Sequence, residues 1–134
     1  MKYLLDTCVL SDFVKGNLNT IKQITTHNPS ELAVSVITIM EVEHGILLIP
    51  GKKSAAIKRI LSDLIQSINI IPFCNETALE AALIRADLHK RGKLIGYYDI
   101  LIGATALHHN LIIVTANVKE FERIDKLKVQ NWRS

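Results

Sequence analysis

The sequence is poor in the residues that build disulfide-bonded or metal-finger domains, because it contains only two cysteines, Cys8 and Cys74. Two cysteines this far apart make no disulfide framework, and neither has the spacing of a zinc finger. Each stands beside apolar residues, so we expect both to be reduced thiols in the hydrophobic core. The chemistry of the protein therefore has to come from other residue types.

Long apolar runs are also missing from the chain. Asp6 interrupts the apolar start of the sequence, which does not fit a secretory signal peptide. No segment approaches the roughly 20 consecutive apolar residues that a membrane helix needs. We therefore expect a cytoplasmic protein with no membrane partner.

Length and composition indicate one globular domain over residues 1–134. Apolar residues make up 49% and charged residues 22% of the chain, which allows a sizeable core. No internal repeat, linker or low-complexity stretch divides it. The net charge of +3 is a mild excess that only hints at a polyanionic partner. The apolar surplus is compatible with hydrophobic surface for a protein partner.

Short apolar runs alternate with longer helical segments along the chain. We predict strands over residues 3–5, 32–34, 68–73 and 111–115, with an edge strand over 128–132. Helices are predicted over residues 7–13, 18–26, 37–49, 52–66, 77–91 and 99–109, with a short helical turn through Phe121. This alternation predicts an α/β fold with a mainly parallel sheet. The functional crevice of such sheets lies beyond the carboxyl ends of the strands, which are followed here by Asp6, Ser35, Cys74 and Thr115.

Asp6 and Asp99 are the first two candidates for chemistry at this crevice. Asp6 follows the first predicted strand, and Asp99 opens the predicted helix 99–109. Either residue could instead be an ordinary helix N-cap, a role that aspartate fills well. Burial of both without a cation would be costly, because unpaired buried charges are strongly disfavoured.

Glu41 is the third candidate, on the apolar helix 37–49. At about 100° per residue, it shares one stripe of the helix with Thr38 and Gly45, whose small side chains give it room to reach a shared site. Glu43 projects to nearly the opposite side and also has apolar flanks, so periodicity alone does not choose between the two glutamates. The small neighbours favour Glu41, and the alternative is a glutamate that faces solvent.

Thr115, Asn117 and Glu120 follow the fourth predicted strand. Asn117 and Glu120 are three residues apart, so one helical turn can point both into the same crevice. Oxygen ligands at several strand ends suit Mg²⁺ or Mn²⁺. The sequence contains no P-loop and no nucleophile elbow, and we expect the adjacent His108 and His109 to diverge at the surface of a helix.

Four segments of the chain resemble, in order, the motifs of PIN-domain nucleases. They are Leu4–Thr7, Ser35–Glu41, Ile95–Asp99 with Ala104 following, and Val114–Phe121. Their order, their spacing and the length of the chain are similar to those of the VapC ribonuclease toxins of VapBC toxin–antitoxin pairs. The resemblance covers the whole chain. It implies a three-layer α/β/α PIN domain and an endoribonuclease that uses Mg²⁺ or Mn²⁺ to hydrolyse RNA such as tRNA.

The resemblance also implies roles for single residues. Asp6, Glu41 and Asp99 match the metal-binding acids of the family. Many members have an aspartate where Asn117 stands, and some have an acid where Glu120 stands, which leaves the fourth ligand open. We expect the charged Glu120 to anchor the metal and Asn117 to orient water or phosphate. The residues expected to act in catalysis are Asp6, Glu41, Asp99, Thr115, Asn117 and Glu120.

Partners follow from the same resemblance. It implies a homodimer and a VapB-type antitoxin whose C-terminal segment covers the active-site groove. Basic residues cluster at Lys52, Lys53, Lys58 and Arg59, and again at Lys90, Arg91 and Lys93. Each cluster is either a contact for the RNA backbone or an ordinary solvated face.

Two other classes of protein remain as alternatives. A phospho-receiver domain is also α/β with a Mg²⁺ site, but it needs an acceptor aspartate after the third strand, where Cys74 stands. A non-catalytic RNA-binding or scaffold module on the same fold is the second alternative, in which Asn117 marks lost chemistry. The three intact acids argue against such a loss.

Overall fold

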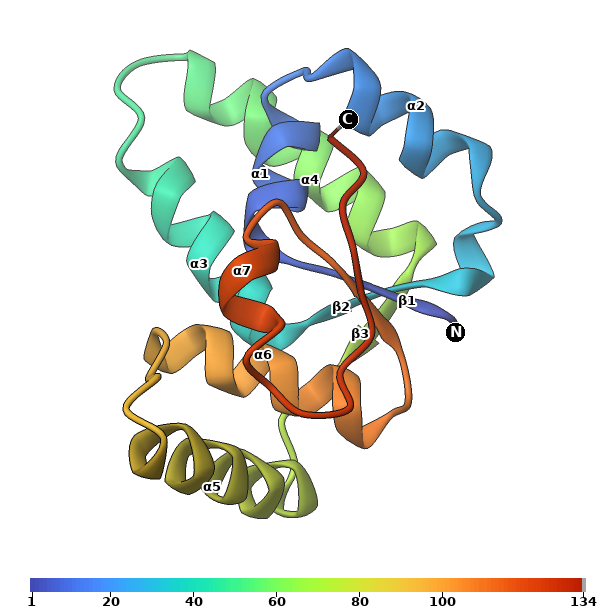
Figure 1. Ribbon diagram of the computed structural model, residues 1–134. Helices are drawn as coiled ribbons and strands as arrows, with labels where there is room; N and C mark the ends of the chain where they lie inside the picture. The colour runs from blue at the N-terminus through green and yellow to red at the C-terminus, as the bar shows by residue number, and fades with distance from the viewer. Residues whose placement is uncertain (134) are drawn as a thin grey trace.

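The computed structural model describes residues 1–133, in which one five-stranded sheet carries helices on both faces (Figure 1). The strands are β1 (Tyr3–Leu5), β2 (Leu32–Ser35), β3 (Asn69–Ile71), β4 (Ile112–Val114) and β5 (Val129–Gln130). The helices are α1 (Thr7–Val14), α2 (Leu18–Thr26), α3 (Val36–Leu47), α4 (Lys53–Ser67), α5 (Asn75–Lys90), α6 (Tyr97–His108) and α7 (Val118–Phe121), with a 3-10 turn, η1 (Pro29–Glu31), before β2. Every helix in this part of the chain is too short or too polar to span a membrane.

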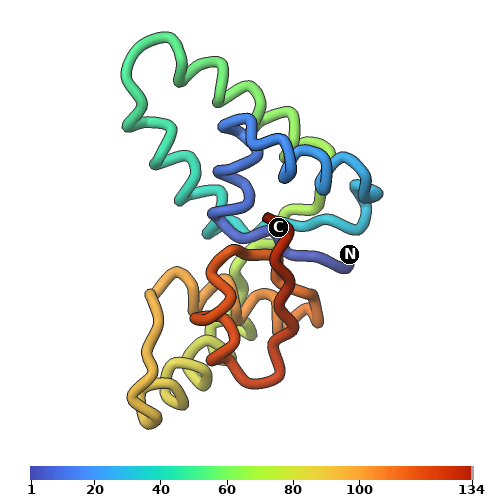
Figure 2. Tube along the Cα trace, turned by 45° about the horizontal axis from the view of Figure 1, so that its top comes forward, coloured from blue at the N-terminus to red at the C-terminus, as the bar shows by residue number. Residues whose placement is uncertain are grey.

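The strands of the described residues are all parallel, in the order β3-β2-β1-β4-β5. β1 is the central strand, where Tyr3 pairs with Leu32 of β2 on one side and with Ile112 of β4 on the other. α1 to α4 lie on one face of the sheet and α5 and α6 on the other (Figures 1 and 2). This arrangement confirms the predicted three-layer α/β/α fold.

Alternate side chains of each strand enter two separate cores. Leu5 and Val34 belong to the core beneath α1, α3 and α4, whereas Leu4 and Ala33 belong to the core beneath α5 and α6. All four side chains are fully buried. A shift of one residue would turn every strand side chain into the wrong layer, so burial on both faces fixes the register. Burial on both faces also explains why these strands read as continuous apolar runs.

The start of α6 and the end of β3 each differ by two residues from the predicted positions. α6 begins at Tyr97, after its N-cap Gly96, so the prediction that Asp99 opens this helix is wrong. Asp99 instead lies in the first turn of α6. β3 is shorter than the predicted range 68–73, because Pro72 follows it and has no amide hydrogen for the ladder.

Candidate functional site

The chain changes direction at the centre of the sheet. From β1 it continues outward to β2 and β3, and it then returns to the other side of β1 to form β4 and β5. The crevice beyond such a switch point is where open α/β sheets bind ligands. β1 and β4 are adjacent at this point, and their carboxyl ends are followed by Asp6 and Thr115.

Asp6 is buried directly at this crevice, with 4% of its surface exposed. Its Oδ2 accepts hydrogen bonds from Thr115 Oγ1 at 2.7 Å and from Cys8 Sγ at 3.5 Å. Its Oδ1 is buried with no hydrogen-bond partner among the described residues. Burial raises the pKa of the carboxyl group, and the Thr115 hydroxyl offsets part of this effect. Asp6 occupies the N-cap position of α1, but its side chain makes no capping hydrogen bond.

Thr115 connects Asp6 to the segment after β4. Its Oγ1 also accepts a hydrogen bond from the backbone amide of Asn117 at 2.9 Å. The side-chain Nδ2 of Asn117 donates to Glu120 Oε2 at 3.0 Å, across one turn of α7. The structure therefore brings the Asn117 amide group and the Glu120 carboxylate together, as expected for residues one helical turn apart.

Glu41 reaches the crevice from α3. Its Oε1 accepts a hydrogen bond from Thr7 Oγ1 at 2.7 Å, and the buried Thr38 Oγ1 lies 3.4 Å from the same hydroxyl. Glu43 points elsewhere and forms a salt bridge with Lys58 of α4. The two glutamates, which periodicity alone did not separate, therefore have different environments: one faces α1 and the other faces α4.

Asp99 is partly buried in the first turn of α6, and its pKa is raised to about 6. The first cause is burial, followed by the negative charges of Asp6, Glu120 and Glu41. The electrostatic field at Asp99 thus includes each of the other three acids. With Glu41, Gly96, Tyr97 and Tyr98, Asp99 lines an open hollow of about 530 Å³.

The four carboxylates supply the kind of oxygen donor that divalent cations prefer. None of them takes part in the salt bridges found within residues 1–133. An unpartnered buried oxygen such as Asp6 Oδ1 costs about 1–3 kcal/mol, and a cation would supply the missing partner. As they stand, no three Asp, Glu, His or Cys side chains of the described residues are arranged to hold an ion. Uncompensated carboxylates repel one another, and a cation would allow them to approach.

The sequence missed two side chains at the site. Thr7 binds Glu41, and Cys8 is a half-buried thiol next to Asp6 rather than a simple core residue. Burial, followed by the charge of Asp6, raises the pKa of Cys8, so the thiol stays protonated and can donate to the carboxylate. Their position directly after Asp6 could have marked both residues as candidates for the site. Their hydrogen-bond partners depend on the packing of α1 against α3 and β4, which the sequence does not show.

Several other residues singled out from the sequence do not join the site. Ser35 accepts a hydrogen bond from the Ile37 amide and caps α3. Cys74 follows β3 at the edge of the sheet and lies 3.2 Å from Thr77 Oγ1. The prediction that His108 and His109 diverge is wrong, because their rings are in edge-to-face contact with centroids 5.0 Å apart.

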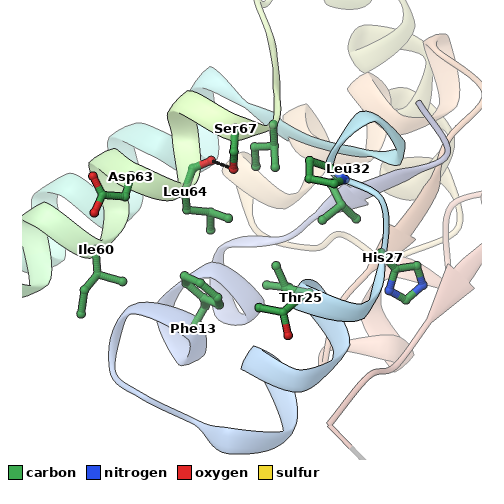
Figure 3. A pocket seen from close by; sticks show the side chains of 11 residues that line it. Phe13, Thr25, His27, Leu32, Ile60, Asp63, Leu64 and Ser67 are labelled. Atoms are coloured by element: carbon green, nitrogen blue, oxygen red, sulfur yellow. Dashed lines mark hydrogen bonds between the residues drawn. The ribbon is translucent and has the colours of Figure 1, made fainter.

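A second cavity lies away from the carboxylates, between α1, α2 and α4 (Figure 3). It has a volume of about 440 Å³, and apolar side chains such as Phe13, Ile60 and Leu64 line it. Its polar groups are few; the Ser67 hydroxyl, for example, already donates to the backbone of its own helix. This cavity contains none of the residues expected to act in catalysis.

Comparison with known proteins identifies the family of this chain. The family model of the PIN domain matches residues 3–127. Ribonuclease VapC2 of Haemophilus influenzae is 33% identical, and the tRNA(fMet)-specific endonuclease VapC of Salmonella typhimurium is 30% identical, each over 98% of both chains. The solved structure of VapBC2 from Rickettsia felis bound to a DNA fragment from their promoter covers 98% of this chain and 99% of its own, with a TM-score of 0.87 at 27% identity. These matches confirm the resemblance noted in the four motifs: the chain belongs to the PIN-domain family and, within it, to the VapC ribonucleases.

Proposed function

We propose that this protein is a Mg²⁺- or Mn²⁺-dependent endoribonuclease that hydrolyses phosphodiester bonds in RNA and acts as the toxin of a toxin–antitoxin pair. The family implies a divalent metal cofactor, and the choice of Mg²⁺ or Mn²⁺ rests on the all-carboxylate donor set. The observation that carries the proposal is Asp6, a buried carboxylate at the switch point with one oxygen left without a partner.

Each acid has a proposed role that follows from its surroundings. Asp6 is a direct ligand, because its Oδ1 has no other partner, and Asp99 is one because it lines the hollow with Glu41. Glu41 ligates directly or through water, held by Thr7. Glu120 completes the set, since its charge acts on Asp99. When bound, a divalent ion lowers the pKa of a coordinated water and stabilises charge on the phosphate.

Thr115 and Asn117 are proposed to position the other groups. The Thr115 hydroxyl donates to Asp6 Oδ2, which directs the second oxygen of that carboxylate away from Thr115 and toward a ligand. Asn117 donates to Glu120, so it orients this carboxylate as well as any water or phosphate oxygen within its reach. This assignment changes the role expected for Asn117, which now acts on the fourth acid itself.

The substrate and partners are proposed by analogy with the relatives. The Salmonella typhimurium protein is named as a tRNA(fMet)-specific endonuclease, which makes tRNA the first RNA to test. The Rickettsia felis protein was solved as a VapBC complex, so we assign this chain a VapB-type antitoxin that covers the active-site groove. A cytoplasmic location is proposed by analogy with the VapC relatives. Exposed Leu79 and Leu83 on α5 and exposed Leu47 and Leu48 at the end of α3 offer apolar surface for a homodimer.

Incubation of the purified protein with end-labelled tRNA, with Mg²⁺, with Mn²⁺ and with excess EDTA, tests the proposal. We expect defined cleavage products with either metal and none with EDTA. Asp99→Asn should abolish cleavage, and Asp125→Asn, on the exposed surface, should not. Binding of RNA without cleavage in any metal would instead support a non-catalytic RNA-binding module. Full activity in EDTA would overturn the metal mechanism.

A further inference from the structure

Two exposed aromatic side chains stand at the mouth of the acidic hollow. Tyr97 is 66% exposed and Tyr98 is 49% exposed, although both directly precede the partly buried Asp99. Both line the same hollow as Asp99 and Glu41. The buried residue of this loop is Ile95, so the tyrosines do not serve as its anchor to the core. Their rings are therefore available to a ligand of the hollow.

Arg85 of α5 fixes the ring of Tyr97. Its guanidinium carbon lies 4.2 Å from the ring centroid, and its Nη2 donates to Tyr97 Oη at 3.1 Å. A cation over one face of the ring favours this orientation, and 66% of Tyr97 remains exposed. The ring is thus presented in a fixed orientation despite its exposure.

The charge of Arg85 is also available. Arg85 takes no part in the salt bridges found within residues 1–133. One basic residue in each of the two clusters noted in the sequence is already paired: Lys58 with Glu43, and Arg91 with Asp87 and with the backbone carbonyl of Arg123. The first cluster begins at Lys52 in the α3–α4 connection, which lies at the far end of α3 from the start of α6 (Figures 1 and 2).

We propose that Tyr97 and Tyr98 form a stacking surface for unpaired RNA bases next to the scissile phosphate, and that Arg85 orients Tyr97 and binds a backbone phosphate. The inference rests on the proposed ribonuclease function and assigns unpaired bases of the substrate to the mouth of the hollow at Tyr97 and Tyr98. Stacking suits this place because an acidic hollow repels phosphates, whereas the π-face of a base carries no net charge. Unpaired bases that stack on aromatic side chains and arginine are the usual means of RNA recognition by proteins.

Single-turnover cleavage of a synthetic tRNA anticodon stem–loop tests the stacking surface. The intact RNA is compared with RNAs in which one loop base at a time is replaced by an abasic site. We expect Tyr97→Ala to lower kcat/KM about tenfold to a hundredfold, and Tyr97→Phe to restore most of it, because phenylalanine keeps the ring. At one loop position, the abasic RNA should lower the wild-type rate by a similar factor and leave the Tyr97→Ala rate unchanged. Leu94→Ala, an exposed residue of the same loop, is the matched control and should behave as wild type.

A salt titration of RNA binding in EDTA tests Arg85 separately. Arg85→Gln should reduce the slope of log Kd against log salt by about one, the value for one lost phosphate contact. Wild-type rates in Tyr97→Ala and Tyr98→Ala would overturn the proposal, as would equal losses on intact and on every abasic RNA. A change in the molecular mass in solution of the tyrosine variants would assign these rings to a subunit contact instead. If the wild type cleaves no RNA yet binds the intact loop more tightly than the abasic loop in EDTA, the proposed function fails and the stacking surface stands.

Discussion

Removing the charge of Asp99 should stabilise the metal-free protein. A pKa raised from 3.8 to about 6 corresponds to about 3 kcal/mol of unfavourable free energy for the charged form in the fold. Solvent screening of this half-buried group reduces the penalty to about 1–2 kcal/mol. Asp99 also lies in the first turn of α6, where a negative charge gains about 0.3–1 kcal/mol from the helix dipole. The dipole is not among the causes of the raised pKa and offsets part of the penalty, so Asp99→Asn should stabilise the fold by about 1 kcal/mol.

The stabilisation should depend on pH in a defined direction. A folded-state pKa above the ordinary value means that the wild type loses stability as the pH rises from about 4 to about 6, and that the loss is complete at about pH 7. The variant has no group to titrate at this position. The two proteins should therefore have similar melting temperatures near pH 4 and differ by about 4 °C at about pH 8.

Thermal unfolding in EDTA, followed by circular dichroism at several pH values, measures this difference. Asp125→Asn is the control, because Asp125 is an exposed aspartate outside the site. Addition of Mg²⁺ should raise the melting temperature of the wild type more than that of Asp99→Asn, because binding to the folded state stabilises it. A lower melting temperature of Asp99→Asn at high pH would refute the reasoning, since it would show that the helix dipole outweighs repulsion from the neighbouring acids.

Two further predictions concern the fourth acid and the packing of α6. Glu120→Gln should raise the Mg²⁺ concentration needed for half-maximal cleavage. Asn117→Ala should raise that concentration less, because Asn117 only orients Glu120. If wild type and Glu120→Gln need the same Mg²⁺ concentration, the site has only three acids. In urea unfolding, Gly103→Ala should be less stable than Gly45→Ala by about 1–3 kcal/mol, because a Cβ at Gly103 would lie 2.5 Å from a buried isoleucine methyl group, whereas at Gly45 it meets open space. Equal stabilities of the two glycine variants would contradict the packing described for α6.

Most of the fold could be predicted from the sequence because the period of apolar residues changes between strands and helices. Runs such as residues 111–115 are apolar throughout, as strands buried on both faces must be. The start of α6 could not be predicted in this way. Gly96 makes no side-chain cap, and the exposed Tyr97 and Tyr98 do not follow the apolar period, so nothing in the pattern marks the first turn.

The candidate site was predictable in its acids and less so in their partners. Asp6 and Thr115 follow strands that the sequence identifies, and parallel pairing then brings them together. The choice between Glu41 and Glu43 depends on which neighbour each one meets: a threonine of α1 or a lysine of α4. These contacts come from helix packing over the sheet, and no local pattern encodes them.

Hydrogen bonds hold Asp6, Glu41 and Glu120 in an arrangement that favours ligand binding over stability. Thr115 satisfies one oxygen of Asp6 and leaves the other without a partner. Asn117 donates to Glu120, whose negative charge acts on Asp99. In the absence of a cation this arrangement leaves buried negative charge uncompensated, at a cost to the fold. The same charges should hold a divalent ion more tightly than three acids would, because each carboxylate adds to the attraction. The same negative charges therefore lower the stability of the metal-free protein and raise its affinity for the metal. A variant that stabilises the metal-free protein by removing one of these charges should bind the metal more weakly.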